Sequence, residues 1–175
     1  MSLVRALPGL TLGALALMAC APAFAATSAG QATAQVISPL AVTSTDLLEF
    51  GTVVGPGTVT VAPITSAAVY GGGAEGICKT ACPLPHAARF EVRGEPGRTY
   101  AVAVPAAIRV TAPGGGAAML IDGFAIVTRS RPGESWGMFD GAGLDRFEVG
   151  GVLHLDNTAE PGQYSAQVPV TVQYF

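Results

Sequence analysis

Apolar and polar side chains alternate along the last part of the chain. Between residues 164 and 174 every second side chain is apolar, and the intervening side chains are mostly polar. Successive side chains of a β-strand point to opposite faces of a sheet, so a period of two places the apolar set on one face. The pattern predicts a half-buried final strand at 163–174, in which Pro169 is irregular because proline cannot donate a ladder hydrogen bond. The apolar set is Tyr164, Ala166, Val168, Val170, Val172 and Tyr174.

The same alternation recurs in short runs between glycine and proline residues, and no sustained helical periodicity interrupts them. Short strands separated by turn signals are typical of an all-β protein, and in particular of an antiparallel β-sandwich. Two segments without this pattern, 70–86 and 131–143, are predicted to be long loops. The predicted strands are 35–43, 49–54, 58–64, 88–94, 99–104, 108–112, 123–130, 145–155 and 163–174.

The first 25 residues have the pattern of a secretory signal peptide. Arg5 supplies a positive charge, the segment 10–21 is apolar and uncharged, and residues 23–25 (Ala-Phe-Ala) form a small-x-small cleavage site. We therefore expect cleavage before Ala26. Two alternatives are an uncleaved amino-terminal anchor and a lipoprotein acylated at Cys20.

The sequence is expected to comprise a signal peptide at 1–25, a flexible segment at 26–35 and one domain at 36–175. No later segment approaches the roughly 20 apolar residues that a membrane-spanning helix needs, so we expect no membrane span in the mature chain. Removal of Arg5 changes the formal net charge from −3 to about −4. This acidic balance gives no electrostatic basis for binding nucleic acid.

Two cysteines, Cys78 and Cys82, remain after the signal peptide. In an exported protein, two thiols this close in the sequence are expected to form a disulfide. Because the loop between them is short, the bridge should contribute less than the ~3 kcal/mol expected of a 15-residue loop. The alternative is a metal site that includes His86, but no adjacent residue supplies the usual fourth ligand. We expect the disulfide and no bound metal.

One motif suggests catalysis and is discounted. Residues 133–137 (Gly-Glu-Ser-Trp-Gly) match the pattern of serine hydrolases, which requires a strand, a sharp turn and a helix. The following residues form helices poorly, and His154 is the one histidine downstream. Asp122, Asp140 and Asp145 come from different segments, and the sequence leaves open whether they meet. We expect no enzymatic activity and no cofactor.

The final strand also carries a resemblance. With Gly162 about fourteen residues from the end and Tyr174 in the penultimate position, it resembles the carboxyl-terminal strand of chaperone–usher pilus subunits. The remainder of the mature chain resembles an uncharacterised family of small secreted, pilin-like bacterial proteins. The segments that carry this likeness are 38–42 (Ser-Pro-Leu-Ala-Val), 46–51 (Asp-Leu-Leu-Glu-Phe-Gly), 90–94 (Phe-Glu-Val-Arg-Gly) and 147–151 (Phe-Glu-Val-Gly-Gly).

The resemblance implies an immunoglobulin-like, pilin-like β-sandwich and an exported subunit that assembles by β-strand addition. The donor would be the segment 26–38 of a second copy or of a related subunit, with a periplasmic chaperone and an outer-membrane usher as further partners. The location would be the periplasm, cell surface or exterior of a Gram-negative bacterium. The strand-pairing interface would comprise Gly162, Tyr164, Val168, Val170, Val172 and Tyr174.

A secreted monomeric binding module is the alternative function. It would hold its ligand with the two expected loops, 70–86 and 131–143. Their aromatic residues are Trp136, Phe139 and Tyr70, which would either contact the ligand or cap the end of the sandwich.

Overall fold

The computed structural model describes residues 34–77, 82–111, 118–157 and 167–175. The chain divides into two compact units, 1–35 and 36–175, and all the described strands belong to the second. These strands pair in antiparallel fashion, and no helix interrupts them in the described ranges, which confirms the all-β prediction. The same ranges contain no helix of the length and apolarity needed to cross a membrane.

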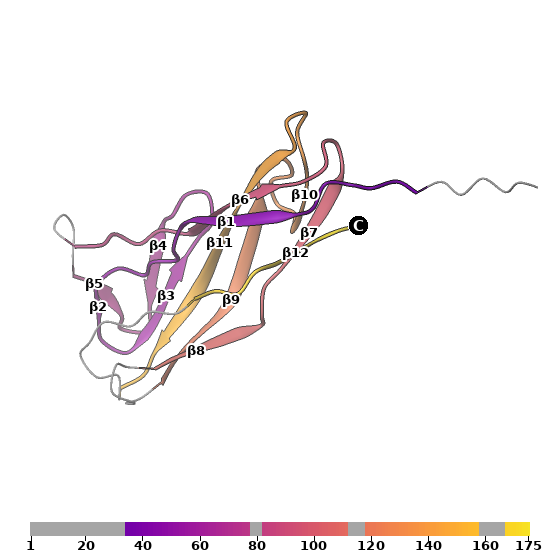
Figure 1. The fold of residues 1–175 in the computed structure, drawn as a ribbon. Helices are drawn as coiled ribbons and strands as arrows, with labels where there is room; N and C mark the ends of the chain where they lie inside the picture. Colours follow the sequence, from indigo (N-terminus) through magenta and orange to yellow (C-terminus); the bar gives the residue numbers. More distant parts are fainter. Residues whose placement is uncertain (1–33, 78–81, 112–117, 158–166) are drawn as a thin grey trace, which may run out of the picture. The chain divides into compact units, whose positions relative to one another are not determined.

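The largest sheet is built around one long strand, β11 (Figure 1). The first half of β11 pairs with β6 and its second half pairs with β3, while β9 runs along its other side. Three outer strands complete the sheet, because β1 pairs with β6, β4 with β3 and β8 with β9. The bounds are β1 Ala41–Asp46, β3 Gly57–Val61, β4 Ala68–Gly71, β6 Ala88–Arg93, β8 Ala107–Thr111, β9 Ala118–Thr128 and β11 Leu144–Leu155.

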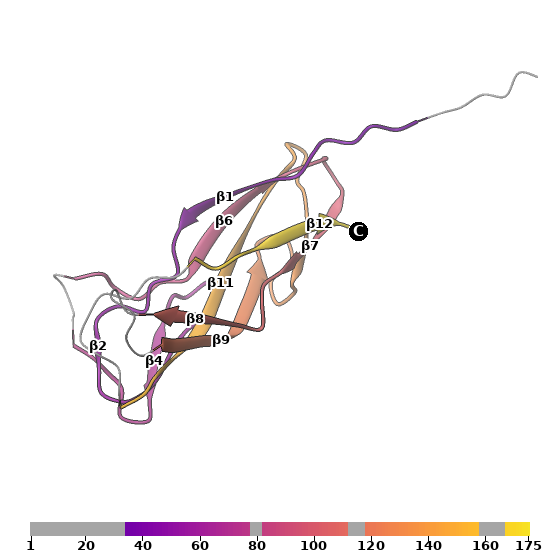
Figure 2. The same cartoon turned by 60° about the horizontal axis from the view of Figure 1, so that its bottom comes forward.

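Two smaller sheets accompany it. Three strands pair in the order β10-β7-β12, with bounds β10 Trp136–Met138, β7 Thr99–Ala103 and β12 Thr171–Tyr174. A two-stranded ribbon pairs β2, Val53–Val54, with β5, Glu75–Gly76. Figure 2 shows β7 and β12 as neighbours at the end of the molecule where β1 begins.

The buried side chains form two clusters that β11 connects. One cluster joins the large sheet to the three-stranded sheet, since Phe147 of β11 and Phe90 of β6 are buried with Tyr100 and Val102 of β7. The rings of Phe90 and Phe147 stack at 4.9 Å. The second cluster gathers β3, β8, β9 and the far end of β11 around the fully buried Val59. Apolar side chains of the large sheet and of the three-stranded sheet therefore share one buried cluster.

Four predicted strands agree with the structure to within one residue at each described end: 88–94, 99–104, 108–112 and 145–155. Each has a clear alternation with one apolar face. Their buried positions, such as Phe90, Val92 and Tyr100, fall on the predicted parity.

Other boundaries were wrong for identifiable reasons. The first strand begins at Ala41 rather than residue 35, just after Pro39, which has no backbone N–H. The final strand begins at Thr171, and the described residues before it, which include Pro169, form no ladder. The strand predicted at 58–64 ends at Val61 because Ile64 adopts a left-handed backbone conformation. Only two residues of the predicted strand 49–54 belong to a strand, and β9 begins earlier than the predicted 123.

The predicted long loops contain three short strands. β4 overlaps the start of the segment 70–86, β5 lies within that segment, and β10 lies within 131–143. These strands have two to four residues, too few for a recognisable alternation.

Candidate interaction site at the final strand

β12 is an edge strand in the described structure. It pairs with β7 alone, with Val172 opposite Val102 and Tyr174 opposite Tyr100. Exposure alternates with the predicted period of two from Val168 onward. The half-buried residues Val168, Val170, Val172 and Tyr174 pack against the cluster that joins the two sheets. Gly162 and Tyr164 lie outside the described residues, and pairing with another chain stays a prediction.

The direction of the free backbone groups follows from the pairing of β7. The backbone N–H of Val102 donates to the carbonyl of Ser135, on the β10 side of β7, at 2.9 Å. Backbone groups of successive strand residues point in opposite directions, so Ala101 and Ala103 face β12 instead. Their partners Gln173 and Thr171 use their backbone groups to bond β7. The N–H and C=O groups of Val172 and Tyr174 therefore point away from the sheet.

The free edge of β1 lies on the same side of the molecule. The side-chain hydroxyl of Thr128 at the end of β9 donates to the carbonyl of Trp136 in β10 at 2.8 Å, so β10 lies over β9. On the opposite side of β7, β12 faces toward β6 and β1, and Figures 1 and 2 both show the end of β12 near the beginning of β1. Within the described ranges, two strand edges without a partner thus flank one side of the shared core.

The hydroxyl group of Tyr174 joins three segments of the chain. It accepts a hydrogen bond from the backbone N–H of Glu95 and donates one to the carbonyl of Ser38, each at 2.7 Å. The backbone N–H and hydroxyl of Ser38 in turn donate to the carboxylate of Glu95, at 2.9 and 2.7 Å. These hydrogen bonds from Ser38 lower the pKa of Glu95. The three residues, named here the Ser38–Glu95–Tyr174 cluster, fix the chain just before β1 to the end of β12.

A buried polar link connects the two sheets next to this site. Asp145 of β11 is 8 % exposed, and its carboxylate accepts a hydrogen bond of 2.8 Å from the hydroxyl of Tyr100 in β7. The hydroxyl of Ser130 and the backbone N–H of Arg146 also donate to this carboxylate. Burial, together with Asp145, raises the pKa of Tyr100. Because the donors satisfy the carboxylate, Asp145 acts as a structural residue that holds the sheets in register.

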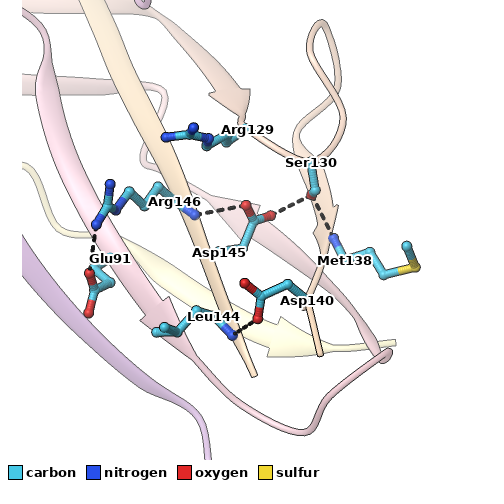
Figure 3. Close-up of a pocket in the computed structure, with 8 residues that line it drawn as sticks. All are labelled: Glu91, Arg129, Ser130, Met138, Asp140, Leu144, Asp145 and Arg146. Atoms are coloured by element: carbon cyan, nitrogen blue, oxygen red, sulfur yellow. Dashed lines mark hydrogen bonds and ion pairs between the residues drawn. The ribbon is translucent and has the colours of Figure 1, made fainter. Parts of the chain in front are cut away.

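The three aspartates of the sequence prediction divide between two places. Asp140 and Asp145 line one open hollow of about 500 Å³, where the backbone N–H groups of the following turn bind Asp140 (Figure 3). Asp122 instead contacts the ring of His154 at 2.8 Å, opposite the distant half of β11. No pair of free carboxylates suited to acid–base catalysis is present among these three.

The predicted disulfide, the metal-site alternative and the serine motif form no functional site among the described residues. Cys78 lies outside the described residues, so the disulfide with Cys82 stays a prediction. Within the described ranges no group of three or more His, Cys, Asp or Glu side chains is placed to hold a metal. Ser135 precedes β10 directly, and neither a sharp turn into a helix nor His154 accompanies it.

The aromatic residues of the two expected loops differ in how deeply they are buried. Phe139 is 1 % exposed and packs at 4.7 Å from Tyr100, so it belongs to the core. Trp136 lies in β10, with the guanidinium of Arg131 4.7 Å from its ring and Phe175 edge-on at 6.0 Å. Only Tyr70 is appreciably exposed, at 37 %, and it lies in β4.

Residues 40–174 match the model of the family described as Domain of unknown function (DUF4402). No curated protein matches the chain. No solved structure matches it either.

Proposed function

This chain belongs to the DUF4402 family, and on that premise we propose that it is an exported structural subunit that assembles by β-strand addition. The proposed fold is an immunoglobulin-like, pilin-like sandwich, with the three-stranded sheet as its smaller layer. The subunit would be pilus-like, fimbria-like or otherwise associated with the cell surface of a Gram-negative bacterium.

The observation that carries this proposal is the free edge of β12. The backbone groups of Val172 and Tyr174 point away from β7, and the four residues of β12 include no charged side chain. Edge strands of monomeric proteins are commonly protected by charges, bulges or covering segments. An uncharged edge beside a half-buried apolar face supports addition of an extended segment, since backbone groups supply affinity and side-chain pockets supply specificity.

The proposed donor is the segment 26–38 of a second copy or of a related subunit. Ala32, Ala34 and Val36 alternate in this segment, and Val36 is 93 % exposed in the described chain. The Ser38–Glu95–Tyr174 cluster holds Ser38, the last residue of this segment, beside the end of β12. A periplasmic chaperone and an outer-membrane usher are the partners proposed for assembly.

A proline pair tests the free edge. Val172→Pro removes an outward N–H, whereas the matched Gln173→Pro removes an N–H that bonds β7. We expect Val172→Pro to fold, to remain monomeric in size-exclusion chromatography and to lose binding of a labelled peptide of residues 26–38. Gln173→Pro should unfold at lower denaturant concentration than Val172→Pro.

Deletion of residues 26–35 gives the complementary test. The shortened protein should lose self-association but still bind the labelled peptide. A mature protein that is monomeric with and without this segment, and that binds no peptide, would contradict strand addition and favour the monomeric binding module. The exposed part of that module would include Tyr70, at 37 %.

A further inference from the structure

The outer face of the large sheet carries a row of charged side chains that ends with two arginines. Glu91 of β6 lies opposite Arg146 of β11, and their side chains form an ion pair at 3.5 Å. On the other side of Arg146, the backbone N–H of Arg129 donates to the Arg146 carbonyl at 2.8 Å. Arg129 therefore lies directly across from Arg146, one residue beyond the end of β9.

The next row of side chains across the same sheet, which contains Arg89, shows the usual alternation of charge. There Arg89 of β6 stands between two acids, at 3.4 Å from Asp46 and 3.3 Å from Glu148. In the row of Arg146, an acid stands on one side only, and the other side is occupied by a second guanidinium. Like charges directly opposite each other across strands are unfavourable.

No described residue forms an ion pair or side-chain hydrogen bond with the guanidinium of Arg129. In Figure 3 the side chains of Arg129 and Arg146 extend in the same direction across β11. The position between them lacks the acid that would continue the alternation of charge.

Two hollows meet at these arginines. The first, of about 500 Å³, is lined by the carboxylates of Glu91, Asp140 and Asp145, and the second, of about 490 Å³, by Val127, Pro132, Arg89 and Glu148. Each of these four carboxylates already accepts hydrogen bonds within the domain. Arg129 and Arg146 line both. We name this continuous surface the arginine groove.

Ile64 at the second hollow has an unfavourable backbone conformation. Its φ is 69°, in the left-handed region that β-branched residues rarely adopt. The carboxylate of Glu148 accepts a hydrogen bond of 2.6 Å from the backbone N–H of Ile64, which stabilises this conformation. The side chain remains 58 % exposed, although it lines the hollow. Strained backbone conformations cluster at ligand-contacting regions, which motivates a contact role for Ile64.

We propose that the arginine groove binds an acidic segment of a partner protein. A carboxylate of that segment would lie between Arg129 and Arg146, where two guanidinium groups match its two oxygens. An apolar side chain next to it would contact Ile64 and Val127. Arg129 and Arg146 lie on the outer face of the sheet, and none of the residues that line the two hollows belongs to β12, so the proposal does not depend on strand addition.

The lining favours a peptide over a saccharide. Saccharide sites commonly present an aromatic face, and the aromatic ring that lines these hollows, Phe147, is 1 % exposed. Both hollows are partly open to solvent, and together they are lined by residues of β6, β9 and β11, which suits an extended chain with alternating side chains.

The test uses the mature protein and an acetylated, amidated peptide of sequence Glu-Val-Glu-Val-Glu, with binding measured by calorimetry in low salt. Gln-Val-Gln-Val-Gln tests the need for charge, and Glu-Ser-Glu-Ser-Glu tests the need for apolar side chains. Arg129→Gln removes the unpaired guanidinium. The matched control is Arg93→Gln, since Arg93 lies on the same face but lines neither hollow.

We expect Arg129→Gln to weaken binding of the first peptide about tenfold, and Arg93→Gln to weaken it less than about twofold. Ile64→Asn should also weaken binding, and it should fold well because asparagine tolerates the left-handed conformation. Absence of binding at millimolar peptide, or equal effects of Arg129→Gln and Arg93→Gln, would overturn the proposal. Equal binding of the valine and serine peptides, with inorganic phosphate competing, would establish a simple anion site instead.

Discussion

The space that Gly94 leaves empty is occupied by the hydroxyl group of Tyr174. A Cβ atom on Gly94 would lie 2.6 Å from that hydroxyl and 2.7 Å from the ring of Phe139. Gly94 ends the paired region of β6, so the penultimate residue of the chain reaches over β6 only because residue 94 has no side chain. The position of the final strand therefore depends on a glycine 80 residues earlier.

Alanine at this glycine should destabilise the protein. Gly94→Ala forces Tyr174 or Phe139 to move, and overpacking of this kind costs about 1–3 kcal/mol. Gly141→Ala is the matched control, because a Cβ atom there meets no atom within 4 Å. Urea unfolding should give a lower free energy of unfolding for Gly94→Ala alone. Equal values for both variants would show that the contact at Gly94 is relieved without cost.

Removal of one hydroxyl group should release the chain before β1. Tyr174→Phe keeps the ring 6.0 Å from Phe139 but loses the hydrogen bonds to Glu95 and Ser38. We expect a loss of about 1–2 kcal/mol in the free energy of unfolding. Hydrogen exchange should become faster at Ser38 and Glu95. Tyr70→Phe, at the half-exposed tyrosine of β4, should change neither quantity.

The same cluster should respond to acid. Hydrogen bonds from Ser38 lower the pKa of Glu95 below its ordinary value of 4.5. A lowered folded-state pKa stabilises the fold above the unfolded-state value, and this contribution is lost as the pH falls through the folded-state pKa. Exchange of the Ser38 amide, corrected for its intrinsic rate, should therefore accelerate below pH 4.5 in the wild type. In Glu95→Gln this acceleration should be absent, and its presence there would assign the effect to another group.

Shortening a side chain should cost more stability at the buried centre of the shared core than at the edge strand β12. Phe147 is 1 % exposed and stacks on Phe90, so Phe147→Ala should cost about 3–5 kcal/mol. Val172 is only half-buried, because one side of β12 is free. Val172→Ala should therefore cost about 1 kcal/mol, less than a fully buried valine would. Chemical denaturation of both variants provides the check, and comparable losses would mean that another chain covers β12 in solution.

The sequence predicted strands well where apolar residues alternate over five or more positions. Phe90 and Val92 share a parity, and their strand was located to within one residue. β10 escaped prediction because it has three residues, and Gly137 in its centre has no side chain to reveal a face. Among the described residues the final strand pairs only from Thr171, although its apolar alternation already includes Val168 and Val170, because Pro169 between them cannot donate a ladder hydrogen bond.

The candidate sites were predictable only in part. The penultimate Tyr174 was recognised as part of a strand, but its partners Ser38 and Glu95 are far from it in sequence. The sequence analysis treated Asp145 as one of several acids on separate segments. Asp145 lies two and four residues before the buried Phe147 and Val149, so it points to the same face of β11. That parity is a usable sequence signal for a buried carboxylate. The pair Arg129 and Arg146 depends on the register between β9 and β11, which no single-strand pattern contains.

The late position of β11 in the chain has a consequence for the order of folding. Its partners β3, β6 and β9 all precede it, and the pairs β3–β4, β1–β6 and β8–β9 are joined to one another through β11. As the chain is synthesised from its amino terminus, these pairs remain separate until residues 144–155 become available. Such long-range pairing is slow because the loops must close before the contacts form. A nascent chain that ends before Leu144 would therefore expose the apolar faces of three separate strand pairs.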